Sequence, residues 1–225
     1  MNAIPFELAA DVTGRVRIGQ VQAAPVSVTA AGRDLQDETD RLAIALRERH
    51  GGCPPASIDG LRPARTLYKA FGIDPTKVRP SSEALLRRVL REQPLPRILN
   101  AVDLCNLLSL SFLLPLGLYD AAKVEGAVTL RTGQAGETYA GIRKQDVRLE
   151  GRPVLSDRCG PFGNPTSDSL RTSVDAQTSS LWLVIFAPAD YSTDRLDAHV
   201  ARASEAMARH LAPAGAPTRT AGALG

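Results

Sequence analysis

The stretch "SSLWLVIFAP" at residues 179–188 is the strongest fold signal in the sequence. It is rich in Trp, Val, Ile and Phe, which favour strands, and it predicts a β-strand. The extended apolar segment "RPVLSDRC" at 152–159 predicts another strand. Between them, "GPFGNPTSDSLRTSVDAQT" at 160–178 combines Gly and Pro with short polar and charged side chains. We interpret it as a structured polar loop rather than a flexible linker.

Most of the predicted helices lie before residue 126, and most of the predicted strands lie after it. Further strands are predicted in "GAVTLRTG" (126–133), "ETYAGI" (137–142) and "VRLEGRPVLSD" (147–157). Apolar residues at helical spacing predict helices within 33–50, 61–75, 79–92, 100–117 and 194–211. In the third of these helices, Ser81 or Ser82 is placed to cap the N-terminus. Helices followed by a run of strands predict an α+β domain, with helices packed on a mainly antiparallel sheet.

The start of the chain predicts a small α/β segment of its own. Residues 14–31 partly alternate apolar and polar positions, which favours a strand or hairpin ahead of the first helix. "GGCPP" then marks a boundary. We therefore expect a strand/helix extension over 1–55, a main domain over 56–211 and a disordered tail over 212–225.

Composition bounds the class of protein. The chain has 225 residues, of which 44% are hydrophobic and 23% charged, as in ordinary globular domains. Aromatic residues are only 4%, which disfavours stacking of single-stranded nucleic acid. The three cysteines are far apart, so no disulfide framework is expected. Together with an acidic N-terminus and no apolar run long enough for a bilayer, this predicts a cytoplasmic protein without a membrane partner.

Basic residues are concentrated between Leu61 and Ile98, where the sequence has nine basic residues and only three acidic ones. A solvated helical surface explains this pattern, and so does a patch that contacts RNA phosphates. The candidate RNA-binding residues are Arg65, Lys69, Arg79, Arg87, Arg88 and Arg91.

Standard catalytic and cofactor motifs are missing from the sequence. There is no Gly-rich phosphate loop, nucleophile elbow or zinc-spaced His pair, so no cofactor or metal is expected. The three histidines lie in predicted helices, where we expect surface roles. Asp103 and Asn106 are polar residues within an apolar helix and need partners, either as buried hydrogen bonds or as the lining of a pocket.

The polar loop is the best candidate site. Arg171 is suited to bind a carboxylate or phosphate with two hydrogen bonds, and Asp168 to hold an amine or orient a water. An Asp–Arg pair that only braces the loop is an equal alternative. The candidate catalytic residues are Asp168, Arg171 and Thr172. The candidate substrate-binding residues are Asp103, Asn106, Asp157, Gly163, Asn164, Ser167 and Ser169.

Four segments occur in an order that resembles a known family. They are "FGIDPTKVRPSSEALLRRVL", "VDLCNLLSLSFLLPLGLYD", "KVEGAVTLRTGQAGE" and "GPFGNPTSDSLRT" with "LWLVIFAP". Over roughly residues 60–190 they resemble the B3/B4 domain, which is the editing domain in the β-subunit of phenylalanyl-tRNA synthetase and also occurs in free-standing proteins. The resemblance implies an α+β fold with a pocket that hydrolyses the ester of a wrongly attached tyrosine to tRNA.

The resemblance also shows where this chain departs from the family. Residues 102–106 and the Gly-x-x-Gly turn at 160–163 match segments that line the family's pocket. The family's pocket His corresponds to Gly117 here, and its pocket Glu to about Val184. The segment with the pocket Thr is missing, whereas the loop after Gly163 is an insertion that we associate with free-standing members.

The leading hypothesis is therefore a free-standing protein that hydrolyses a mischarged aminoacyl-tRNA, or a related amino-acid ester, in trans. A second hypothesis is an enzyme recruited to modify a free amino acid or small metabolite. A third is a non-catalytic module that binds an amino acid or tRNA.

Overall fold

The computed structural model describes residues 3–142 and 146–213. Its helices are α1 (Arg33–His50), α2 (Arg62–Ala70), α3 (Ser81–Leu90), α4 (Asn100–Phe112) and α5 (Thr193–Leu211). Its strands are β1 (Phe6–Leu8), β2 (Val16–Ala23), β3 (Leu116–Asp120), β4 (Val128–Thr132), β5 (Thr138–Ala140), β6 (Asp146–Arg148), β7 (Pro153–Asp157), β8 (Gly160–Gly163) and β9 (Leu181–Pro188). Short 3-10 helices cover Pro55–Ser57, Asp59–Leu61 and Ala121–Lys123.

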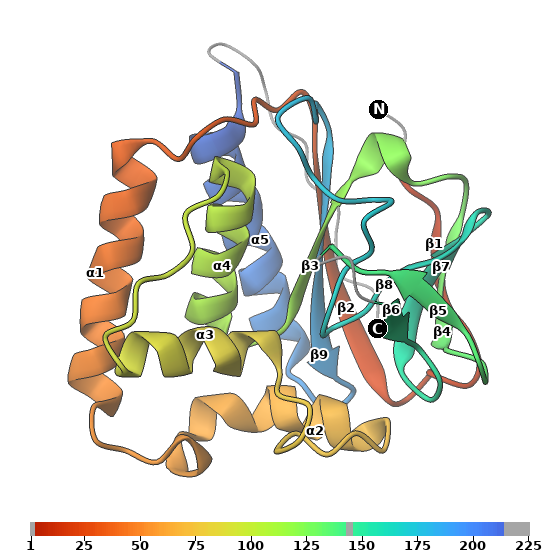
Figure 1. Cartoon of the computed structure of the whole chain (residues 1–225), viewed down its shortest axis with the longest axis horizontal. Helices are drawn as coiled ribbons and strands as arrows, with labels where there is room; N and C mark the ends of the chain where they lie inside the picture. Colours follow the sequence, from red (N-terminus) through yellow and green to blue (C-terminus); the bar gives the residue numbers. More distant parts are fainter. Residues whose placement is uncertain (1–2, 143–145, 214–225) are drawn as a thin grey trace.

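The strands form three sheets. One has the order β2-β9-β3, a second the order β1-β4-β7-β8, and a third pairs β5 with β6. All pairings are antiparallel except that of β1 with β4. β9 is the central strand of its sheet, because β2 pairs with all eight of its residues and β3 with five. Figure 1 shows α1, α3, α4 and α5 on one side of β9 and the second sheet on the other.

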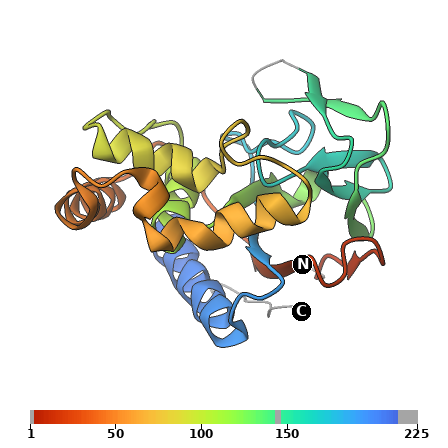
Figure 2. The same ribbon diagram turned by 90° about the horizontal axis from the view of Figure 1, so that it is seen from below.

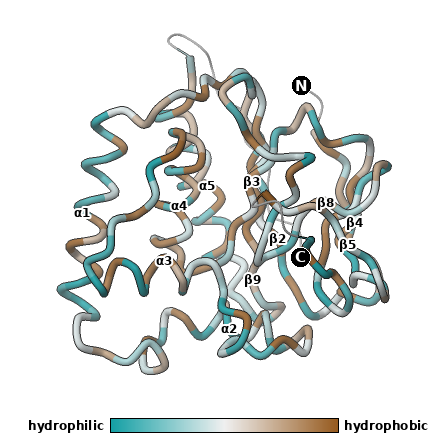
Figure 3. The backbone as a smooth tube through the Cα atoms, in the orientation of Figure 1, coloured by the Kyte–Doolittle hydropathy of each residue, from teal (hydrophilic) through white to brown (hydrophobic). Residues whose placement is uncertain are grey.

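β9 is buried along its whole length, and its two faces contact different layers. Leu183 and Ile185 pack in a core with α4 and α5. Trp182, Val184 and Phe186 pack in a second core with β4, β7, β8 and α2. Figure 2 shows α2 beneath the junction of the helices and the sheets, and Figure 3 shows the hydrophobic stretches along β3 and β9. The fold is thus α+β, in three layers.

The predicted α+β class and the five helices are confirmed, while several details differ. The helix predicted within 100–117 ends at Phe112, because Leu113 adopts a left-handed conformation with φ 54°. The residues that follow form β3, a strand that we did not predict. The polar loop contains a strand of its own, β8, which pairs with β7. β2, from the N-terminal extension, supplies a full strand of the central sheet. From residue 214 on, the predicted tail lies outside the described residues.

Two local predictions were wrong. Pro80 is the N-cap residue of α3, no side chain caps it, and the Ser81 and Ser82 hydroxyls have no hydrogen-bond partner among the described residues. His199 is half-buried rather than a plain surface residue, and its ring stacks on Phe112 with centroids 4.1 Å apart. Burial, together with nearby arginines, lowers the pKa of His199 to about 4. The side chain of His210 is largely buried against Glu38.

A buried acid organises the basic helices. The Glu83 side chain is 1% exposed and accepts two hydrogen bonds from Arg65, at 2.8 and 2.9 Å. It also pairs with Arg87 at 3.1 Å and Arg79 at 3.8 Å. Burial alone raises the pKa of a carboxyl group, but here the hydrogen bonds from the arginines outweigh it and the pKa of Glu83 is lowered.

We expect Glu83→Gln to lower the free energy of unfolding by about 3 kcal/mol, because it leaves three guanidinium groups without their shared counter-charge. Urea denaturation at pH 7 measures this loss. Glu48→Gln, an exposed acid on α1, is the matched control and should change stability by less than about 0.5 kcal/mol. Equal stability of the two variants would contradict a structural role for Glu83.

Candidate functional site

The polar site begins with a buried tyrosine. Tyr119 lies on β3, and its side chain is fully buried. Its ring packs edge-on against Phe162 of β8, with centroids 5.1 Å apart, and lies 5.7 Å from Trp182 of β9. Its hydroxyl donates a hydrogen bond of 2.8 Å to Oδ1 of Asp168 in the polar loop. The aromatic core therefore positions a loop carboxylate.

Two glycines make room for this hydroxyl. Gly117 on β3 and Gly163 on β8 both lie directly beside the phenol of Tyr119. A Cβ atom at either position would overlap the phenol oxygen and its ring carbon. Both positions therefore require glycine because of a close approach, rather than because of a special backbone angle.

Asp168 is a carboxyl group in unfavourable surroundings for a charge. Burial raises its pKa to about 7, although hydrogen bonds from Tyr119 and from the backbone of Leu118 act in the opposite direction. Cys105 of α4 lies close enough for the Asp168 charge to act on it. Burial, reinforced by Asp168, raises the pKa of the Cys105 thiol to about 12, so the thiol stays protonated and is a poor nucleophile.

The first half of the polar loop is held by its own side chains. Asn164 is buried, and its amide oxygen accepts hydrogen bonds from the backbone N–H groups of Thr166 and Ser167 at 2.8 and 2.9 Å. Its amide nitrogen donates to Tyr139 Oη at 2.8 Å, and Tyr139 in turn donates to the carbonyl of Ser167. Asn164 and Ser167 thus fix the turn that leads to Asp168.

Arg171 and Asp157 form the brace that the sequence left as an alternative to a binding role. The Arg171 guanidinium donates to both carboxylate oxygens of Asp157, at 3.1 and 2.9 Å, and its Cζ lies 5.4 Å from the centroid of the Phe162 ring. The Asp157 side chain is fully buried, whereas that of Arg171 is 34% exposed. Thr172 and Ser169 are buried beside it, with their hydroxyl oxygens 3.4 Å apart.

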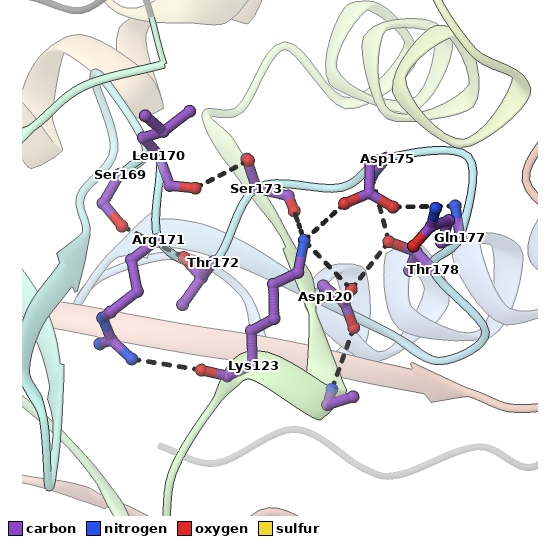
Figure 4. A network of polar contacts seen from close by, with 11 residues as sticks. Asp120, Lys123, Ser169, Leu170, Arg171, Thr172, Ser173, Asp175, Gln177 and Thr178 are labelled. Carbon is purple, nitrogen blue, oxygen red and sulfur yellow. Dashed lines mark hydrogen bonds and ion pairs between the residues drawn. The ribbon is translucent and has the colours of Figure 1, made fainter.

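The second half of the loop is tied to the end of β3, as Figure 4 shows. Lys123 donates to the carbonyl of Ser173 and to Asp175, both at 2.8 Å. Thr178 donates to Asp120 at 2.8 Å and also accepts from the backbone of Asp175. These bonds fix the loop after Asp168, as Asn164 and Tyr139 fix it before Asp168.

The other predicted residues lie in separate places. Arg65, Arg79 and Arg87 surround Glu83, and Arg88 donates to the carbonyl of Pro94 at 2.9 Å. Lys69 and Arg91 are exposed. Asp103 and Asn106 line a cavity between α1 and α4 that does not include the loop. The structure therefore brings together Asp157, Gly163, Asn164, Ser167, Asp168, Ser169, Arg171 and Thr172, but not the two residues of α4.

Tyr119 and Tyr139 were missed by sequence reasoning. Tyr119 stands in the "LGLYD" segment, directly after an apolar helix, and nothing in that pattern indicates that its hydroxyl reaches a loop 49 residues later.

Across residues 3–142 and 146–213, no group of His, Cys, Asp or Glu is arranged to hold a metal ion. Among the described helices, none combines the length and apolar character that a membrane span requires.

The raised pKa of Asp168 predicts a pH dependence of stability. In the unfolded chain an aspartate ionises near pH 4, whereas the folded protein holds the Asp168 proton until about pH 7. Stability should therefore fall as pH rises from 4 to 7. Asp168→Asn should remove this loss and raise the free energy of unfolding at pH 8 by about 2 to 4 kcal/mol.

Urea denaturation of wild type and variant between pH 4 and pH 8 measures this difference. Asp190→Asn, an exposed aspartate after β9, is the control and should follow the wild type at every pH. A constant difference between Asp168→Asn and wild type would contradict the raised pKa.

Comparisons with known proteins identify the family. The sequence model of the B3/4 domain matches residues 63–216. The chain is 39% identical over 61 residues to a phenylalanine–tRNA ligase beta subunit of Paramagnetospirillum magneticum, covering 27% of this chain and 8% of that protein. It is 39% identical over 95 residues to that of Brucella abortus, covering 38% and 12%.

Among solved structures, an N-terminal fragment of the phenylalanyl-tRNA synthetase beta-subunit from Pyrococcus horikoshii aligns with 93% of this chain and 49% of its own. The TM-score is 0.47 and the sequence identity 12%. The chain spans only about a tenth of the length of its curated relatives. Since the family match covers more than half of the sequence, this chain belongs to the B3/4 domain family.

Proposed function

We propose that this protein hydrolyses the ester bond between an amino acid and tRNA, acting in trans on a mischarged aminoacyl-tRNA. The observation that carries the proposal is the Asp168 carboxyl group, which has a pKa of about 7 and receives a hydrogen bond from Tyr119. A general base works best when its pKa lies near the operating pH. Membership of the B3/4 family and relatives named as phenylalanine–tRNA ligase beta subunits support this substrate class.

Asp168 acts as the general base in this proposal. Ester hydrolysis begins when a water oxygen attacks the carbonyl carbon while its proton moves to a base. The Asp168 carboxylate takes that proton, and the resulting carboxylic acid returns it to the ribose oxygen as the ester bond breaks. Tyr119 is a positioning residue, since its hydroxyl holds Oδ1 of Asp168.

The structure changes the role that we assign to Arg171. Its guanidinium is already bound to both oxygens of Asp157, so it braces the loop instead of stabilising negative charge on the substrate. The backbone N–H groups of Ser167 and Ser169 are also occupied, by Asn164 and by the carbonyl of Phe162. We therefore assign stabilisation of the oxyanion to hydroxyl groups of the loop, namely those of Ser169, one residue after Asp168, and Thr172, four residues after it.

We assign the binding of tRNA phosphates to the basic residues of α2 and α3. Glu83 neutralises one of its three arginine partners, so a net positive charge remains around it, and Lys69 and Arg91 add exposed charges from the same segment. Contacts to phosphates release counterions, so binding of tRNA should weaken steeply with salt.

We expect Asp168→Asn to reduce hydrolysis about 100-fold or more, because removing a general base commonly costs this much. The purified protein is incubated with a panel of correctly and wrongly charged tRNAs, and release of the amino acid is followed. Asp190→Asn serves as the matched control with unchanged rates. Full activity of Asp168→Asn, or no release from any member of the panel, would overturn the proposal.

Tyr119→Phe tests the positioning role separately. The Tyr119 hydrogen bond lowers the pKa of Asp168, so its loss should shift the midpoint of the pH–rate profile to higher pH. The profile of kcat between pH 5 and pH 9 measures this shift. A lower rate with an unchanged midpoint would show that Tyr119 contributes only to packing.

A further inference from the structure

A cavity of about 400 Å³ lies between α1, the segment 92–97 and α4. Its volume is large enough for a small organic molecule. Apolar side chains from several elements form part of its wall, namely Leu35, Ala43, Val89 and Leu95. Asp168 and the rest of the polar loop do not line it.

One side of the cavity offers hydrogen-bond acceptors without partners. Asp103 is 8% exposed, and its Oδ1 accepts a hydrogen bond of 2.9 Å from the backbone of Ile98. Among the described residues, the second oxygen of Asp103 and the side-chain amide of Asn106 have no hydrogen-bond partner. The free oxygen of Asp103 and the amide oxygen of Asn106 can therefore accept hydrogen bonds from a ligand. An ammonium group is the complement of this pair.

The side formed by α1 offers a cation. Arg47 is half-buried, lines the cavity and has no ion-pair partner in the described part of the chain. Arg97, at the same cavity, is already bound to Gln36 at 3.0 Å and to Asp40 at 3.4 Å. Arg47 is therefore the guanidinium that is available to a carboxylate.

We propose that this cavity binds a free α-amino acid with an apolar side chain. Its ammonium group binds Asp103 and Asn106, its carboxylate binds Arg47, and its side chain packs against Leu35 and Val89. Because α1 lies before the segment 63–216 that matches the family, this site combines a helix inside that segment with one outside it. The site is separate from Asp168 and does not depend on hydrolysis.

Isothermal titration calorimetry of the full chain with L-leucine, L-phenylalanine and L-methionine tests the proposal without any tRNA. At least one of these should bind. For the one that binds, we expect the matching amino-acid amide and the N-acetyl derivative to bind at least tenfold more weakly, because each lacks one charged group. The absence of binding for all three amino acids would overturn the proposal.

Variants place the ligand within the protein. Arg47→Gln should weaken binding at least tenfold, whereas Arg49→Gln, on the exposed side of the same helix, should bind as the wild type does. Asp103→Asn should also weaken binding, and it keeps an oxygen to accept from Ile98. Binding that survives Arg47→Gln but is lost in Asp168→Asn would place the ligand in the polar loop and contradict the proposal.

Discussion

Strand β9 has no exposed face, so a layer of apolar side chains must cover each side of it. α4 and α5 cover one side, and the four-stranded sheet together with α2 covers the other. The contact between the four-stranded sheet and β9 brings Phe162 of β8 against Trp182 of β9 and Tyr119 of β3. This aromatic cluster determines where the Tyr119 hydroxyl lies, and hence which part of the polar loop it holds. The candidate site is therefore a consequence of how the central strand is covered.

Two carboxyl groups of this protein have opposite pKa shifts because their surroundings differ. Glu83 lies among three arginines, and its pKa is lowered. Asp168 has no cation partner among the described residues and accepts a hydrogen bond from the Tyr119 phenol, and burial raises its pKa to about 7. The first acid is a permanent counter-charge that stabilises the basic helices. The second can exchange a proton near neutral pH, which suits a reaction and costs stability.

Patterns local in sequence predicted much of the fold, and contacts distant in sequence account for what was missed. Helical spacing predicted α1 and α5, and the β-prone run predicted β9, because each signal lies within its own segment. β3 was missed because it follows an apolar helix after only three residues, at a left-handed Leu113. The loop was identified by its composition, but whether Arg171 binds Asp157 or a ligand depends on tertiary packing. The cavity between α1 and α4 could not be predicted either, because it depends on how these two helices pack against each other, which no local sequence pattern describes.

The close packing of Gly117, Tyr119 and Gly163 has a consequence for how family members diverge. In the resemblance described above, the family's pocket histidine corresponds to Gly117. In this fold the phenol of Tyr119 occupies the space where any side chain at 117 would begin. A histidine at 117 and a tyrosine at 119 in this rotamer are therefore mutually exclusive. Exchange of one for the other must therefore occur as a coupled change at both positions.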